Sequence, residues 1–125
     1  MNRFIYTAMA LAFISCTGLN VTADAVQPPS APFINMLKAV ASSDIEGFKA
    51  SYARHIREDE QQSDWEKNIS EARANIRKIF GDAKSDDFAF KFDEDESKLG
   101  IIHKGRFVFW IGIIKEDGVW KLNER

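Results

Sequence analysis

The sequence predicts an α+β domain in which three N-terminal helices pack on a curved four-stranded antiparallel meander, after a signal peptide. Apolar residues recur at helical spacing in the first half of the domain and alternate at strand spacing in the second. All segments with the helical pattern precede all segments with the strand pattern, and this order is typical of α+β domains. At 125 residues, with 45% hydrophobic and 29% charged residues, the chain has the size and balance of one globular domain.

The first 25 residues have the pattern of an export signal. A short basic start precedes the apolar run 4–14, which has the length of a secretory signal core and is too short to span a bilayer. We therefore predict a signal peptide over 1–25, a tether over 26–30 that its two prolines keep extended, and a domain over 31–125.

Two processing sites compete within the signal. The small-x-small sequence 23–25 predicts cleavage after Ala25, whereas the sequence that ends at Cys16 resembles a lipobox, whose cysteine becomes lipidated. We expect cleavage after Ala25 and an exported, periplasmic protein. The alternative is a membrane-anchored lipoprotein that meets the membrane only through Cys16.

Amphipathic stripes and capping signals predict the three helices. Two helices follow a Ser-Asp-x-Glu sequence, which is typical of a capping box in which the serine side chain accepts a bond from an orphan backbone N–H. We assign Ser43 and Ser63 to this role, Ser30 to the N-cap of the first helix and Gly81 to the C-cap of the third. The predicted helices are 31–41, 44–57 and 64–80.

Alternating side chains and turn signals predict the strands. Phe88, Phe90 and Phe92 alternate with smaller or polar residues, which indicates a strand with one buried face. Further along, Gly105 and Gly118 follow Lys and Asp in sequences that favour hairpin turns. The remaining predicted strands are 99–104, 106–115 and 118–124.

The strand 106–115 is apolar on both faces. Counting by twos places Phe107, Phe109, Ile111 and Ile113 on one face and Val108, Trp110, Gly112 and Ile114 on the other. The helices can cover only one of these faces. We therefore expect the other face to meet a small apolar ligand, a protein partner or a second copy of the chain.

Composition argues against several classes of function. The formal net charge is -2, and no basic run is interleaved with aromatic residues, so we do not expect nucleic-acid binding. The single cysteine, Cys16, cannot form an internal disulfide, and no cluster has metal-ligand spacing. The acidic loop 93–97 lacks the spacing and the glycine of a calcium-binding EF-hand. We predict neither a metal site nor a cofactor.

Two stretches resemble the nuclear transport factor 2-like, or cystatin-like, superfamily. Residues 33–52, FINMLKAVASSDIEGFKASY, are similar to the opening helix, short break and second helix of such domains, and residues 114–122, IKEDGVWKL, resemble their final hairpin. The resemblance covers roughly residues 31–124 and implies a curved sheet that folds around helices to form a cone. The superfamily includes isomerases, dehydratases and cyclases as well as binding and dimerisation modules, so the resemblance implies no single activity.

Few residues are candidates for chemistry. Tyr52 and His55 are three apart in the predicted second helix, so they would be neighbours on one face and could exchange a proton with a carbonyl compound. A core Tyr52 and a surface His55 are the more ordinary interpretation. His103 is expected at an exposed strand end, and Trp110 and Trp120 are expected in the core or in a pocket wall.

The sequence thus favours a non-enzymatic binding or interaction domain that uses the concave apolar face of its sheet. The alternative is a small pocket enzyme acting on a carbonyl compound or lactone, and an immunity or secretion accessory protein is a third hypothesis. The residues expected to contact a ligand are Tyr52, Trp65, Val108, Trp110, Ile114 and Trp120.

Overall fold

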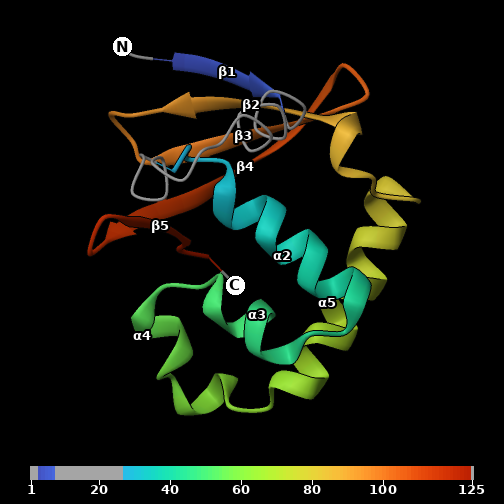
Figure 1. Ribbon diagram of the computed structural model, residues 1–125, viewed down its shortest axis with the longest axis vertical. Coiled ribbons are helices and arrows are strands. Elements are labelled where there is room, and N and C mark those ends of the chain that lie inside the picture. The colour runs from blue at the N-terminus through green and yellow to red at the C-terminus, as the bar shows by residue number, and fades with distance from the viewer. Residues whose placement is uncertain (1–2, 8–26, 125) are drawn as a thin grey trace, which may run out of the picture.

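The computed structural model describes residues 3–7 and 27–124 and has an α+β fold (Figure 1). Four α-helices of the described chain lie between the first strand and the rest of an antiparallel sheet in the order of the sequence. The α+β class and the antiparallel arrangement are therefore confirmed. The predicted processing sites at Cys16 and Ala25 lie outside the described residues.

The sheet has the strand order β1-β2-β3-β4-β5 and is antiparallel throughout. Strands β2 to β5 form a meander, whereas the helices lie between β1 and β2 in the sequence. Lys104 and Gly105 in one hairpin turn, and Asp117 and Gly118 in another, all have positive φ, which is the conformation that two-residue hairpin turns favour. The four predicted strands are present, and β1 adds a fifth within the segment predicted to be the signal peptide. The strands are β1 Arg3–Thr7, β2 Phe88–Asp93, β3 Lys98–His103, β4 Arg106–Glu116 and β5 Val119–Leu122.

The first and third predicted helices are observed as α2 (Ala31–Ser42) and α5 (Trp65–Phe80). Before α2, a hydrogen bond from the Ala31 N–H to the Pro28 carbonyl closes a turn, and Ser30 in that turn is fully buried. The end of the predicted tether is thus packed against the domain. Ser30 does precede the helix, but its side chain makes no capping hydrogen bond.

The predicted second helix, 44–57, is wrong as one continuous helix. It is divided into α3 (Ile45–Ala50) and α4 (Arg54–Arg57). Between them the backbone pairs with β5: the Leu122 N–H donates to the Ser51 carbonyl at 2.7 Å, and the Ala53 N–H donates to the Leu122 carbonyl at 2.8 Å. These bonds from a distant strand replace helical bonds, and the helix breaks because its backbone groups find these partners instead.

Aspartates, not serines, cap α3 and α5. The Asp44 carboxylate accepts from the Gly47 N–H at 3.0 Å, and the Asp64 carboxylate accepts from the Lys67 N–H at 3.1 Å. Ser43 cannot cap α3 because it has a left-handed conformation, φ 56°, that ends α2. Glycine at 47 lets the Asp44 carboxylate approach closely, since a Cβ there would stand too close to its Oδ2 atom and displace the capping side chain.

The hydrophobic core lies between the helices and one face of the sheet. Phe33 of α2 contacts the aromatic rings of Phe80, Phe88 and Phe90 with centroid separations of 5.5 to 6.4 Å. Aromatic pairs in such edge-on arrangements stabilise a core beyond their buried area. The core cluster also includes Ile34, Met36, Leu37, Ala39, Val40, Phe48, Ile56, Trp65, Ile69, Phe92, Leu99, Ile101, Ile113 and Leu122.

A β-bulge in β4 changes which side chains share a face. Ile101 pairs with Phe109, but the next residue, Ile102, pairs with Phe107, so Val108 is an extra residue in the ladder. The predicted grouping of Phe107 with Phe109 is therefore wrong. Phe107 lies instead beside Trp110, with ring centroids 5.4 Å apart.

Candidate functional site

A cavity of about 490 Å³ lies where α2, α3 and α5 face the middle of β4. Its volume falls within the range of small-molecule pockets, about 300–1,000 Å³. Apolar atoms of aromatic and aliphatic residues make up most of the lining area, and polar atoms make up the rest. The lining residues are Phe33, Met36, Phe48, Tyr52, Ile56, Trp65, Asn68, Glu71, Ala72, Asn75, Ile76, Ile79, Phe80, Phe109, Trp110, Ile111, Leu122 and Glu124.

Three aromatic rings form a cluster in the cavity wall. Phe48, Tyr52 and Trp65 have pairwise centroid separations of 5.3, 5.8 and 5.8 Å. Helix α3 supplies Phe48, the first residue of α5 supplies Trp65, and the segment between α3 and α4 supplies Tyr52. Since each ring contacts the other two, the cluster holds its shape without a ligand, and a preformed wall lowers the cost of binding.

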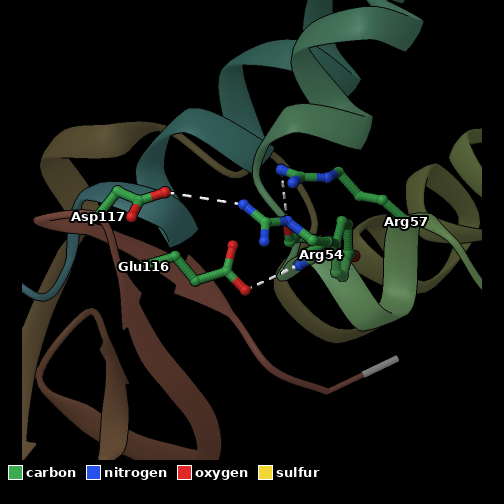
Figure 2. A network of polar contacts seen from close by, with 5 residues as sticks. Arg54, Arg57, Glu116 and Asp117 are labelled. Atoms are coloured by element: carbon green, nitrogen blue, oxygen red, sulfur yellow. Dashed lines mark hydrogen bonds and ion pairs between the residues drawn. The ribbon is translucent and has the colours of Figure 1, made fainter.

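Polar contacts hold the segment that carries Tyr52 against the sheet. Glu116 accepts from the Arg54 N–H at 2.9 Å, and the Arg54 guanidinium lies 3.7 Å from the Asp117 carboxylate. The Arg57 guanidinium donates to the Tyr52 carbonyl at 3.3 Å. Figure 2 shows the two Arg54 contacts, which join α4 to the end of β4 and to the turn that follows it. Together with the bridge between Tyr52 and Leu122, they fix the backbone from which the Tyr52 ring points.

Burial raises the pKa of the Tyr52 phenol to about 12, because the phenolate would lose its hydration in this apolar wall. The hydroxyl therefore stays protonated at neutral pH. A protonated phenol can donate a hydrogen bond to a ligand oxygen in the cavity.

The polar lining comes mainly from one stripe of α5. Asn68, Glu71 and Asn75 are spaced by three and four residues and so lie along one side of the helix. Glu124 completes it, and its carboxylate accepts from the Gly112 N–H at 2.9 Å. Sequence reasoning missed these four residues. A signal was available in the sequence: Asn68 and Asn75 are two helical turns apart and so lie on the same side of α5, close to its apolar stripe.

The predicted ligand-contacting residues are divided between two places. Tyr52, Trp65 and Trp110 line the cavity. Val108 and Ile114 do not: both are exposed on β4. Trp120 packs edge-on against Phe92 at 5.3 Å and is partly buried against the core. The cavity instead uses Phe109 and Ile111, which face the helices.

The structure does not bring Tyr52 and His55 together as the sequence suggested. Tyr52 lies in the break before α4, whereas His55 is inside α4, exposed, and outside the lining of the cavity. The His55 Nε2 atom shares a hydrogen bond with the Asn123 Oδ1 atom. The two side chains would have shared one face only if the helix had been continuous.

His103 was expected at an exposed strand end, and that prediction is wrong for its ring. The imidazole lies beside Phe80 and Phe88, with centroid separations of 5.0 and 4.8 Å. Its Nε2 atom is buried and has no hydrogen-bond partner within the described chain. His103 packs against the core through Phe80 and Phe88 and does not line the cavity.

The opposite face of β4 carries an exposed aromatic pair. The rings of Phe107 and Trp110 both lie over Gly100 of β3, where a Cβ would stand 3.0 Å from each ring. The Lys91 ammonium lies 5.8 Å from the Phe107 ring centre. Phe107 is 46% exposed. The second apolar face that the sequence predicted is therefore present and lies open in the described chain.

The cavity combines a mainly apolar lining with the phenol of Tyr52 and the carboxylates of Glu71 and Glu124. Across residues 3–7 and 27–124, His, Cys, Asp and Glu side chains form no group of three or more that could hold a metal ion. Nor does any helix in those ranges combine the length and the apolar character needed to cross a membrane. Comparison with known protein families, with curated proteins and with solved structures gives no match for this chain.

Proposed function

We propose that this is a non-enzymatic binding domain of the nuclear transport factor 2-like type, and that it takes a small apolar ligand in the cavity between its helices and β4. The observation that carries the proposal is the cavity of about 490 Å³ with a mainly aromatic and aliphatic wall. We further propose that the protein is exported to the periplasm after cleavage at Ala25, or is anchored through Cys16 in the alternative.

The wall supports binding because it offers apolar area together with a few orienting polar groups. Burying apolar surface contributes about 25 cal/mol per Å², so even a ligand of modest size gains several kcal/mol in such a cavity. Asn68, Asn75 and the Tyr52 hydroxyl provide polar groups that would fix its orientation. The ordered contacts between Phe48, Tyr52 and Trp65 support a wall that needs little rearrangement.

Catalysis on a carbonyl compound is the weaker proposal for the same cavity. Tyr52 lines the cavity and carries a phenol that could donate a hydrogen bond, but His55, the base that the enzyme hypothesis needs, does not line the cavity. His55 is also engaged with Asn123. A general base must come within hydrogen-bond reach of the proton that it removes. Catalysis in this cavity would therefore need a base other than His55, whereas binding needs none.

Filling the cavity tests the proposal directly. Ala72 lines the cavity, and Ala74 lies two residues further along α5 with an exposed side chain. We expect Ala72→Phe to abolish the fluorescence gain of Nile red, a neutral apolar dye, because the new ring occupies the space of the dye. Ala74→Phe is the matched control and should bind the dye like the wild type.

Circular dichroism and thermal unfolding must first show that both variants fold. If a folded Ala72→Phe variant binds Nile red with unchanged affinity, the dye binds elsewhere and the cavity is not the site. If the wild type binds neither Nile red nor octanol at concentrations up to millimolar, the proposed function is lost altogether.

A further inference from the structure

The charged groups in the lining of the cavity are carboxylates. Glu71 and Glu124 line it, and among the described lining residues there is neither a lysine nor an arginine. The remaining polar side chains, Asn68, Asn75 and Tyr52, are neutral at pH 7 because burial raises the pKa of Tyr52 to about 12 and amides do not titrate. The lining as a whole therefore carries negative charge.

Among the described residues, no buried cation neutralises either carboxylate. Glu71 lies 3.9 Å from the Lys67 ammonium, but both side chains are largely exposed, and exposed pairs of this kind are weak. Glu124 accepts from the uncharged Gly112 N–H, which leaves its charge in place. Glycine at 112 allows this contact, since a Cβ there would be 3.3 Å from the Glu124 Cγ.

From this charge distribution we infer that the cavity selects amphiphiles with a cationic or neutral head and rejects those with an anionic head. The inference rests on the proposed function and names the ligand class for the same site. An ammonium head gains attraction from Glu71 and Glu124, and a cation that reaches further in meets the aromatic residues Tyr52 and Trp65 of the wall. A carboxylate head meets like charge, and the lining offers it no cation.

Three ligands with the same eight-carbon tail separate charge from tail burial. Octylamine, octanol and octanoate differ only in the head, and at pH 7 they are cationic, neutral and anionic. We expect them to bind the purified protein in that order of affinity in Nile red displacement, with octylamine at least about fivefold tighter than octanoate, which is the scale of exposed charge interactions. The difference should shrink at about 0.5 M NaCl because salt screens charges near the surface.

Glutamine variants assign the selectivity to the two carboxylates. Glu71→Gln and Glu124→Gln should each narrow the difference between octylamine and octanoate while leaving octanol binding almost unchanged. Glu66→Gln is the matched control, because Glu66 is exposed on α5 and does not line the cavity. It should leave all three affinities unchanged.

The outcomes for the inference and for the proposed function are distinct. If octanol binds but octanoate binds as tightly as octylamine, the inference is overturned and the binding function stands. The same holds if the order is found but survives in the double variant of Glu71 and Glu124. If none of the three ligands displaces the dye, both the binding function and the inference fail.

Discussion

The two faces of β4 are nearly equal in apolar character and differ in what covers them. On the inner face, Ile113 is 1% exposed and lies in the core, and Phe109 and Ile111 pack against the same core cluster. On the outer face, Phe107 and Ile114 are 46% and 38% exposed. The apolar character of a strand therefore predicts neither its burial nor its role, because both depend on what packs against each face.

The largest expected effect comes from comparing one phenylalanine on each side of the sheet. Phe90 is fully buried in the core, so Phe90→Ala should reduce the free energy of unfolding by about 3–5 kcal/mol. Phe107→Ala on the open face should cost less than about 1 kcal/mol. Urea unfolding of both variants measures the difference. Equal losses would show that the outer face is covered in solution and that the two faces do not differ.

Tyr52 gives the cavity wall a pH dependence that the outer face lacks. The pKa of its phenol is about 12 in the folded protein and about 10 in an unfolded chain, so the unfolded state loses its proton first as the pH rises. Below pH 10 the Tyr52 phenol is protonated in both states, so its contribution to the free energy of unfolding does not change there. The folded state should lose about 2–3 kcal/mol between pH 10 and 12.

Other groups titrate in that range, so Tyr52→Phe is the control. Urea unfolding at several pH values should show a steeper decline for the wild type than for Tyr52→Phe, and the absorbance of the phenolate should rise near pH 12. Parallel declines would mean that the ring is hydrated and that the cavity wall is open to water around it.

Trp110 borders the cavity, but its ring lies on the outer face of β4, over Gly100 and beside Phe107. It is partly exposed, so Trp110→Ala should cost about 1–2 kcal/mol, less than the loss of a sealed aromatic residue. Unfolding at two protein concentrations checks the origin of the loss: a loss that becomes smaller on dilution would indicate that a second copy buries the ring, because dilution removes the stability that association gives to the wild type.

Most elements of this fold could be predicted because their signals are local, but β1 was not expected within the segment predicted to be the signal peptide. The boundaries of α2, α5 and the strands β2 to β5 follow from spacing, turns and end signals within a few residues of the sequence. The break between α3 and α4 could not be found in this way, because its cause is a bridge to Leu122 in β5. A segment that is helical by its own pattern was redirected by a distant strand.

The site was only partly predictable for a related reason. Tyr52, Trp65 and Trp110 were singled out because large aromatic residues stand out in the sequence, and all three lie along the cavity. The face of β4 was assigned by counting in twos, and one extra residue at Val108 is enough to move Phe107 to the other side. Glu71 has no sequence signal of its own, since its position at the cavity depends on the rotation of α5 in the folded domain.

The bridge between Tyr52 and Leu122 also has a consequence for the order of events in folding. Its partners are far apart in the chain, and closing so long a loop costs entropy that local structure does not. Until β5 pairs with the segment 51–53, we expect that segment to keep the helical conformation that its sequence favours. The wall of the cavity that Tyr52 supplies is therefore expected to be assembled late, after the helices and the central hairpins have already formed.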